Sequence, residues 1–251
     1  MIESLARHPR TVVLVLLAVT LVPAWAWIIL MARDMYGSMQ GPSAWMMSLT
    51  WDWPRVVLLW AMWAVMMAAM MLPAAAPVLL LFAGSVRNRE PEAAALKTWL
   101  LAAGYVLVWA VFSVAATALQ RLLARLFVLT PMMEPATPVL GAILLALAGL
   151  YQLTPLKRVC LRTCRSPLSF LTQHWRPGRA GALRMGIDHG IHCLGCCWAL
   201  MLLLFAGGVM NLTVILALTV WVLVEKLAPF GEAGARLAGV GLLAAAAWMV
   251  M

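Results

Sequence analysis

The sequence predicts an all-α protein, a bundle of about seven transmembrane helices, and its composition and its apolar runs lead to this class. Hydrophobic residues make up 65% of the 251 residues, and only 11% are charged. Soluble domains carry about 25% charged residues, so this chain falls outside that class. Several apolar runs approach the roughly 20 residues that a helix needs to cross a bilayer. We therefore expect residues 1–251 to form a single transmembrane domain.

The apolar runs give the expected order of the elements. Seven spans are predicted, at about 11–31, 55–83, 98–120, 137–153, 189–208, 211–228 and 235–251. Gly207, Gly208 and Asn211 interrupt the long apolar run between 189 and 228, which predicts a tight hairpin there. Residues 154–188 are rich in Lys and Arg, and we expect them to form a basic cytoplasmic loop between the fourth and fifth spans.

The distribution of basic residues predicts the orientation. If the N-terminus lies in the cytoplasm, 14 of the 18 Lys and Arg residues fall on the cytoplasmic side and 4 fall outside. Lys and Arg are enriched in cytoplasmic loops, so this ratio favours a cytoplasmic N-terminus. The net charge of +9 then reflects membrane topology, and it predicts no nucleic-acid partner.

Five cysteines fall in two clusters, both near the predicted cytoplasmic face. Cys160 and Cys164 occur in C-L-R-T-C, and the other three, Cys193, Cys196 and Cys197, occur in H-C-L-G-C-C-W. Thiols stay reduced in the cytoplasm, so these cysteines suit metal binding or redox chemistry better than structural disulfides. Buried cysteines that only pack are the alternative interpretation. The prolines and glycines of 166–188 allow the chain to turn back and bring the clusters together.

The second cluster continues along one face of its predicted helix. The face holds five residues at positions i, i+3, i+4, i+7 and i+8, namely His189, His192, Cys193, Cys196 and Cys197, and Met201 continues the stripe at its edge. Thiolates with imidazoles suit zinc, whereas thiolates with thioethers suit copper(I). We therefore predict a soft-metal site here, with His189 and Met201 as candidate additional ligands.

A methionine-rich stretch of the second span is a further candidate. Met66 and Met70 share one helical face, and Met71 lies on the adjacent face. Thioethers bind soft copper(I), but methionine is also a flexible apolar residue that fills helix interfaces, so both a thioether relay and plain packing are open. Pro73 and Pro77 free backbone carbonyls that need other partners or line a cavity.

Two charged residues, Glu225 and Lys226, end the sixth span. An ionisable residue at membrane depth is a functional candidate by default. The alternative is that Lys226 snorkels to the boundary and the two residues form a local ion pair.

These segments together resemble the DUF2182 family of bacterial predicted metal-binding integral membrane proteins. The similarity covers about residues 55–230 and runs through M-M-A-A-M-M-L-P-A-A-A-P, L-T-P-L-K-R-V-C-L-R-T-C and V-E-K, with C-L-G-C-C-W-A-L-M as its most specific part. The resemblance implies metal binding in a bacterial inner membrane, and it supplies no reaction. The family motif falls on Met66, Met67, Met70, Met71, Pro73, Gln152, Lys157, Cys160, Cys164, His189, Cys193, Cys196, Cys197, Met201, Met210, Asn211 and Glu225.

The leading hypothesis is a multi-pass protein of the bacterial inner membrane that binds a soft metal and transfers, transports or delivers it. Copper(I) is favoured and zinc is second. The expected partners are the lipid bilayer and a metal-delivery protein or membrane complex. A membrane thiol–disulfide oxidoreductase is one alternative, and a structural or assembly subunit that packs through its small-residue helices is another. No catalytic residue is predicted. The sequence has no Walker loop, dinucleotide fingerprint or H-E-x-x-H motif, so nothing in it indicates ATP-driven transport.

Overall fold

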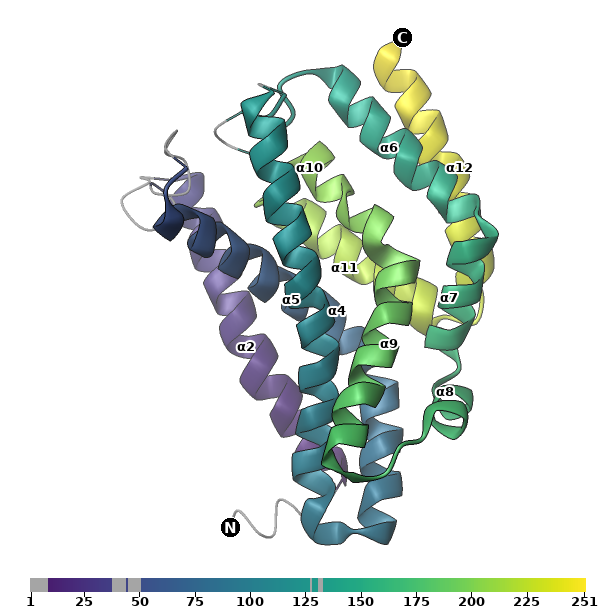
Figure 1. The fold of residues 1–251 in the computed structure, drawn as a ribbon. Coiled ribbons are helices and arrows are strands. Elements are labelled where there is room, and N and C mark those ends of the chain that lie inside the picture. The colour runs from purple at the N-terminus through teal and green to yellow at the C-terminus, as the bar shows by residue number, and fades with distance from the viewer. Residues whose placement is uncertain (1–8, 38–43, 45–50, 127, 131–132) are drawn as a thin grey trace.

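A computed structural model of the protein describes residues 9–37, 44, 51–126, 128–130 and 133–251 (Figure 1). Within these residues the chain is 88% helical and forms no strand, which confirms the all-α class. The helices are α2 (Pro9–Met35), α4 (Trp53–Arg89), η1 (Pro91–Ala93), α5 (Ala94–Arg125), α6 (Pro138–Leu153), α7 (Pro155–Arg165), α8 (Pro167–His174), α9 (Gly178–Met201), α10 (Leu203–Gly207), α11 (Leu212–Leu227) and α12 (Gly231–Val250).

Five helical segments in the described part of the chain are long and apolar enough to cross a membrane, which indicates a membrane protein. They cover 10–35, 53–89, 91–125, 178–207 and 231–250. Helices α6 and α7 qualify as a sixth only if taken together, and they are bent by 67° relative to each other. The predicted count of seven spans is therefore not confirmed. The reason is length, since α6 and α11 have 16 residues each and reach only about 24 Å, short of a hydrocarbon core of about 30 Å. The orientation of the N-terminus stays a prediction.

The helices surround a central group formed by α4, α5 and α9. Helix α5 packs against both α4 and α9, and α2 covers α4 on the other side (Figure 1). Helices α6 and α12 lie side by side at the opposite edge. The short helix α7 packs on α9, and α11 contacts α4, α7 and α9. Two short helices thus converge on α9 from different parts of the sequence.

Helices α5 and α9 approach each other closely because glycines lie at their crossing. A Cβ atom on Gly104 would overlap the carbonyl oxygen of Leu183, and one on Gly186 would overlap that of Leu101. Gly186 and Gly190 have the G-x-x-x-G spacing that is typical of close helix contacts in membranes. This crossing holds the middle of α5 directly against the helix that carries three of the cysteines.

The segment 154–188 is largely helical, and its place as a basic cytoplasmic loop between two spans stays a prediction. Thr154 caps α7, because its hydroxyl accepts a hydrogen bond from the Lys157 backbone N–H at 3.2 Å. Pro155 and Pro167 stand at the starts of α7 and α8, where a helix has no use for the missing N–H. Helix α9 begins at Gly178 rather than at residue 189. Hydropathy does not reveal α7, α8 or the first turns of α9, because charged and polar residues interrupt their apolar runs.

Helix α4 continues through both of its internal prolines. Pro73 and Pro77 lie inside its 37 residues. The hydroxyl of Tyr105, on α5, lies 2.9 Å from the carbonyl oxygen of Met71 in this stretch, and can donate to it. A side chain of a neighbouring helix therefore donates a hydrogen bond to the α4 backbone near the prolines, as expected for proline-containing membrane helices.

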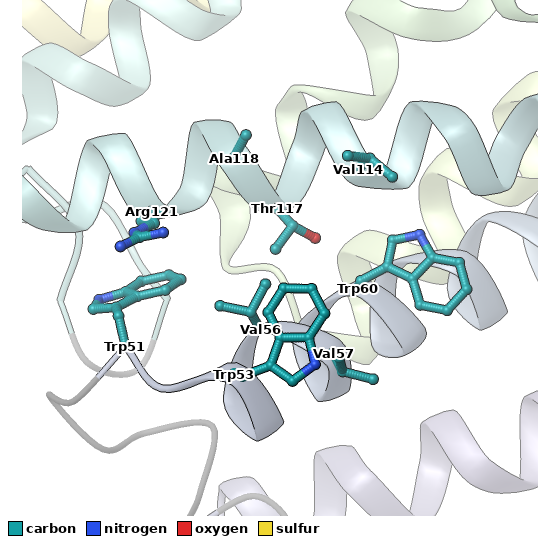
Figure 2. Close-up of a pocket in the computed structure, with 9 residues that line it drawn as sticks. All are labelled: Trp51, Trp53, Val56, Val57, Trp60, Val114, Thr117, Ala118 and Arg121. Carbon is teal, nitrogen blue, oxygen red and sulfur yellow. The ribbon is translucent and has the colours of Figure 1, made fainter.

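Tryptophans line a groove between the start of α4 and the end of α5. The groove has a volume of about 480 Å³ and is bordered by Trp51, Trp53, Trp60 and Arg121, with apolar side chains between them (Figure 2). Trp53 is 77% exposed. Exposed tryptophans are typical of the membrane interface. None of the predicted metal-site residues lines this groove, so the candidate metal site lies in another part of the molecule.

Candidate metal site

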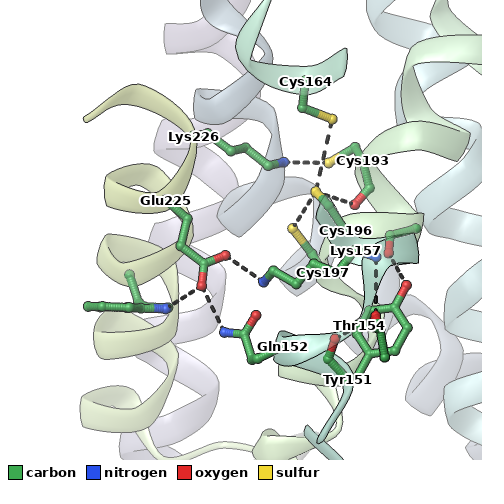
Figure 3. Close-up of polar contacts among 12 residues, drawn as sticks. Tyr151, Gln152, Thr154, Lys157, Cys164, Cys193, Cys196, Cys197, Glu225 and Lys226 are labelled. Carbon is green, nitrogen blue, oxygen red and sulfur yellow. Dashed lines mark hydrogen bonds and ion pairs between the residues drawn. The ribbon is translucent and has the colours of Figure 1, made fainter. Parts of the chain in front are cut away.

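Four of the five cysteines come together in the interior and are called here the thiol cluster: Cys164 of α7 with Cys193, Cys196 and Cys197 of α9 (Figure 3). Cys196 lies at its centre, with its Sγ 3.2 Å from that of Cys197 and 3.9 Å from that of Cys164. Cys196 also donates to the carbonyl of Cys193 over 3.1 Å. All four are buried free thiols. The two cysteine clusters of the sequence therefore meet in space.

Cys160 lies outside the thiol cluster. It is half-buried, and it forms no hydrogen bond with another sulfur within the described part of the chain. Its Sγ packs on Gly195, where an added Cβ would come within 2.8 Å of it. The Tyr151 hydroxyl donates to the carbonyl of the same glycine. Gly195 thus allows α7 to lie directly on α9, which brings Cys164 against Cys196.

Two polar side chains from other helices contact Cys193. Lys226 of α11 donates to the sulfur over 2.7 Å, and the Tyr105 hydroxyl of α5 lies 2.9 Å from it. A buried lysine needs a counter-charge, and Lys226 is only 6% exposed. A Cys193 thiolate would supply that charge. In that state Tyr105 would turn its single proton from the Met71 carbonyl to the sulfur.

Beside the cluster lies a buried ion pair between α7 and α11. Lys157 Nζ is 2.7 Å from Glu225 Oε2, and both side chains are 1% exposed. Gln152 donates to the other carboxylate oxygen over 2.8 Å (Figure 3). Trp221 donates to the same oxygen over 2.7 Å. The alternative interpretation, a local ion pair between Glu225 and Lys226, is therefore wrong. Neighbouring residues on a helix point in different directions, so each of the two takes a partner from another helix.

His189 is buried, but it lies next to the thiol cluster rather than within it. Its ring stacks on Tyr105 with centroids 5.6 Å apart and packs against Phe170 at 4.9 Å. Its Nδ1 has no hydrogen-bond partner in the described part of the chain. Tyr105 also contacts Cys193, so the Tyr105 side chain lies between His189 and the cluster. Its role as a ligand stays a prediction.

The predicted thioether residues Met66, Met70, Met71 and Met201 are fully buried. Tyr105 joins this region to the cluster, because it contacts the Met71 backbone and the Cys193 sulfur. Burial agrees with a thioether relay and equally with apolar packing. The relay therefore also stays a prediction.

The donor set of the cluster suits a soft metal, although it is not a preformed cage. Two thiolates that share a metal through bonds of about 2.3 Å lie within about 4.6 Å of each other, and both sulfur separations at Cys196 meet this limit. No group of three or more His, Cys, Asp or Glu side chains among the described residues is arranged to hold a metal ion as it stands. The thiols would have to lose protons and turn toward a common point to bind one.

Sequence reasoning missed the partners of the cluster more than the cluster itself. Lys226 is a functional candidate from the sequence, but nothing in the sequence links it to Cys193. A lysine within an apolar run is a usable signal, because it needs a counter-charge. Tyr105 carries no comparable signal, since its place depends on the glycine-mediated crossing of α5 and α9.

Comparison with known families gives one match. A family model described as "PpoB2: Copper chaperone" matches residues 60–249. This stretch contains α7, α9 and α11, and therefore the whole thiol cluster. No curated protein and no solved structure matches the chain. The match agrees with the expected metal-related family and with copper, whereas zinc receives no support and the DUF2182 label stays a prediction.

Proposed function

Because the chain belongs to the PpoB2 copper chaperone family, we propose that it carries copper(I) as cargo on its thiol cluster and delivers it to a partner protein. One observation carries the assignment to this site. Cys196 lies within 3.9 Å of a sulfur on another helix and 3.2 Å from one on its own helix. Soft thiolates favour copper(I) over hard cations.

The charges around the cluster support binding of a cation. Deprotonated thiolates are the ligands of copper(I), and their charge must be compensated in an apolar interior. Lys226 provides that compensation for Cys193 over 2.7 Å. A bound copper ion would take over part of this role. Copper would therefore replace the lysine as the cation at the Cys193 sulfur, and Lys226 would lose part of its counter-charge.

The same proposal includes the location of the site. Five apolar helices agree with a multi-pass protein of the bacterial inner membrane. With the N-terminus in the cytoplasm, the ends of α7 and α11 near the cluster face the reducing side. Thiols there stay reduced, as a copper(I) carrier requires.

Metal analysis of the full chain tests the proposal. The protein is purified in detergent from copper-supplied cells, and its copper content is compared with a variant in which Cys164, Cys193, Cys196 and Cys197 are changed to serine. Cys160→Ser is the matched control, because it makes the same chemical change outside the cluster. We expect the fourfold variant to lose its copper and the control to keep it, with both still folded by their thermal melts. Equal copper in all three proteins would exclude the cluster as the carrier site.

Two alternatives are separated by further measurements. The contact of Cys164 with Cys196 across two helices favours a thiol–disulfide oxidoreductase, and reversible loss of two free thiols per chain without metal would support it. An assembly subunit would use its small-residue helix α12 as an interface. One face of α12 is already used within the chain, because Gly239 packs on Gly149 of α6, where a Cβ would lie 3.0 Å from the Gly149 carbonyl oxygen. The face that carries Gly241 has nothing within 4 Å of an added Cβ, and co-purification of a partner without bound copper would support this alternative.

A further inference from the structure

Three histidine side chains gather around one phenylalanine beside the thiol cluster. The ring centroid of Phe170 on α8 lies 4.7 Å from that of His174, 4.9 Å from that of His189 and 6.3 Å from that of His192. The chain has 4 histidines in all. Most of its imidazoles thus occur in one place, between α8 and α9.

The hydrogen bonds of His174 and His192 fix which ring nitrogen carries the proton. His174 Nδ1 lies 3.1 Å from the Phe170 carbonyl oxygen, and His192 Nδ1 lies 2.8 Å from that of Asp188. A carbonyl oxygen only accepts, so each Nδ1 is the protonated nitrogen, and in the neutral ring Nε2 keeps its lone pair. Histidines that bind metals commonly donate their other N–H to a backbone carbonyl in this way.

The two rings also have a separation that fits one shared metal ion. Their centroids lie 5.8 Å apart, with the ring planes at 76°. Two imidazoles bonded to one metal over about 2 Å place their ring centroids roughly 6 Å apart. Copper(I) accepts two ligands in a near-linear arrangement, so it needs no third residue. Both side chains are half-buried, and an ion can reach them without crossing the protein interior.

We propose that His174 and His192 form a docking site for copper(I), from which the ion passes to the thiol cluster; this step rests on the proposed function. Imidazole is a borderline ligand, whereas thiolate is a soft one, so a soft ion gains free energy by moving from the first to the second. His192 directly precedes Cys193 on α9. The two kinds of ligand therefore lie at the same level of the helix.

His189 gives this proposal a second, independent observation. It is only 2% exposed, and its Nδ1 has no hydrogen-bond partner among the described residues. Leaving a buried polar atom unsatisfied is destabilising, so such an atom calls for an explanation. The ring lies between Phe170, which contacts the docking pair, and Tyr105, which contacts Cys193. A transient bond to the passing ion would give this nitrogen its partner.

A binding experiment tests the docking site apart from the thiol cluster. The background is the full chain with the four cluster cysteines changed to serine, and copper(I) affinity is measured by competition with a chromophoric chelator. His174→Asn and His192→Asn are combined, because the asparagine amide retains a donor near the place of Nδ1 and removes Nε2. We expect affinity to fall at least tenfold. Gln173→Ala, an exposed neighbour, is the control and should change it less than twofold. A change under twofold in the double variant would overturn the docking site.

A loading experiment with the natural cysteines tests the passage. Copper(I)–glutathione is mixed with the full chain, and copper uptake is followed in time. The double asparagine variant should load at least tenfold more slowly and reach the same final content. An unchanged rate would overturn the passage. Failure of the proposed function would look different, since the fourfold serine variant would then keep its copper whatever residues 174 and 192 are.

Discussion

The buried ion pair between Lys157 and Glu225 gives the sharpest prediction about stability. Changing Glu225 to Gln removes the negative charge but keeps an oxygen for the N–H groups of Gln152 and Trp221. The Lys157 ammonium, 1% exposed, then has no counter-charge at 2.7 Å. Breaking a buried pair in this way costs about 3–5 kcal/mol. For a chain of this size that corresponds to a fall of roughly 6–20 °C in melting temperature.

The assay is thermal unfolding in one detergent, followed by intrinsic tryptophan fluorescence and compared as apparent midpoints at a fixed scan rate. Glu232→Gln is the matched control, because it removes the same charge from the exposed ion pair with Arg162, and we expect it to leave the midpoint nearly unchanged. The double variant Lys157→Met with Glu225→Gln removes both charges and should recover most of the loss. The reasoning is refuted if Glu225→Gln has the same melting midpoint as the wild type. It is also refuted if Lys157→Met and Glu225→Gln lower the midpoint additively in the double variant.

Three further predictions follow from close contacts. Gly186→Ala should separate α5 from α9, because its Cβ would overlap the Leu101 carbonyl, and should lower the melting temperature, whereas Gly84→Ala, with nothing within 4 Å, should not; equal midpoints would contradict this. Tyr105→Phe keeps the ring but loses its hydroxyl contacts at 2.9 Å to the Met71 carbonyl and Cys193, so a loss of about 1 kcal/mol is expected in the same melt; a stabilised variant would argue against both contacts. Gly195→Ala should be destabilising because its Cβ would come within 2.8 Å of the Cys160 sulfur, and adding Cys160→Ala should restore the midpoint; failure of this rescue would place the strain elsewhere.

Most of the helices could be predicted from the sequence, because long apolar runs have few alternatives in a membrane. Hydropathy does not reveal the short helices α7 and α8, since charged residues interrupt their apolar pattern. Their starts were nonetheless encoded, in Thr154-Pro155 and in Pro167, as caps and first-turn prolines. Local capping signals therefore locate such helices better than hydropathy does.

The candidate site was only partly predictable, for a different physical reason. Helical periodicity places Cys193, Cys196 and Cys197 on one side of α9, and all three are buried together. That Cys164 joins them while Cys160 does not depends on how α7 lies on α9, and hence on the contact at Gly195. Periodicity describes one helix at a time, and it contains no information on the rotation of one helix against another.

If the thiol cluster carries copper(I), the position of Lys226 has a consequence for its release. The ammonium lies 2.7 Å from the Cys193 sulfur, which is also the atom that would bind an incoming copper ion. Binding then separates a buried lysine from its counter-charge, and each 1.4 kcal/mol of that cost raises the dissociation constant tenfold. When the ion leaves, the lysine returns to the thiolate and no buried charge is left unpaired. A thiolate cage without a neighbouring cation would leave its buried thiolates unpaired when the metal departs. A chaperone must release its metal to a partner, and the position of Lys226 beside the cluster favours that release.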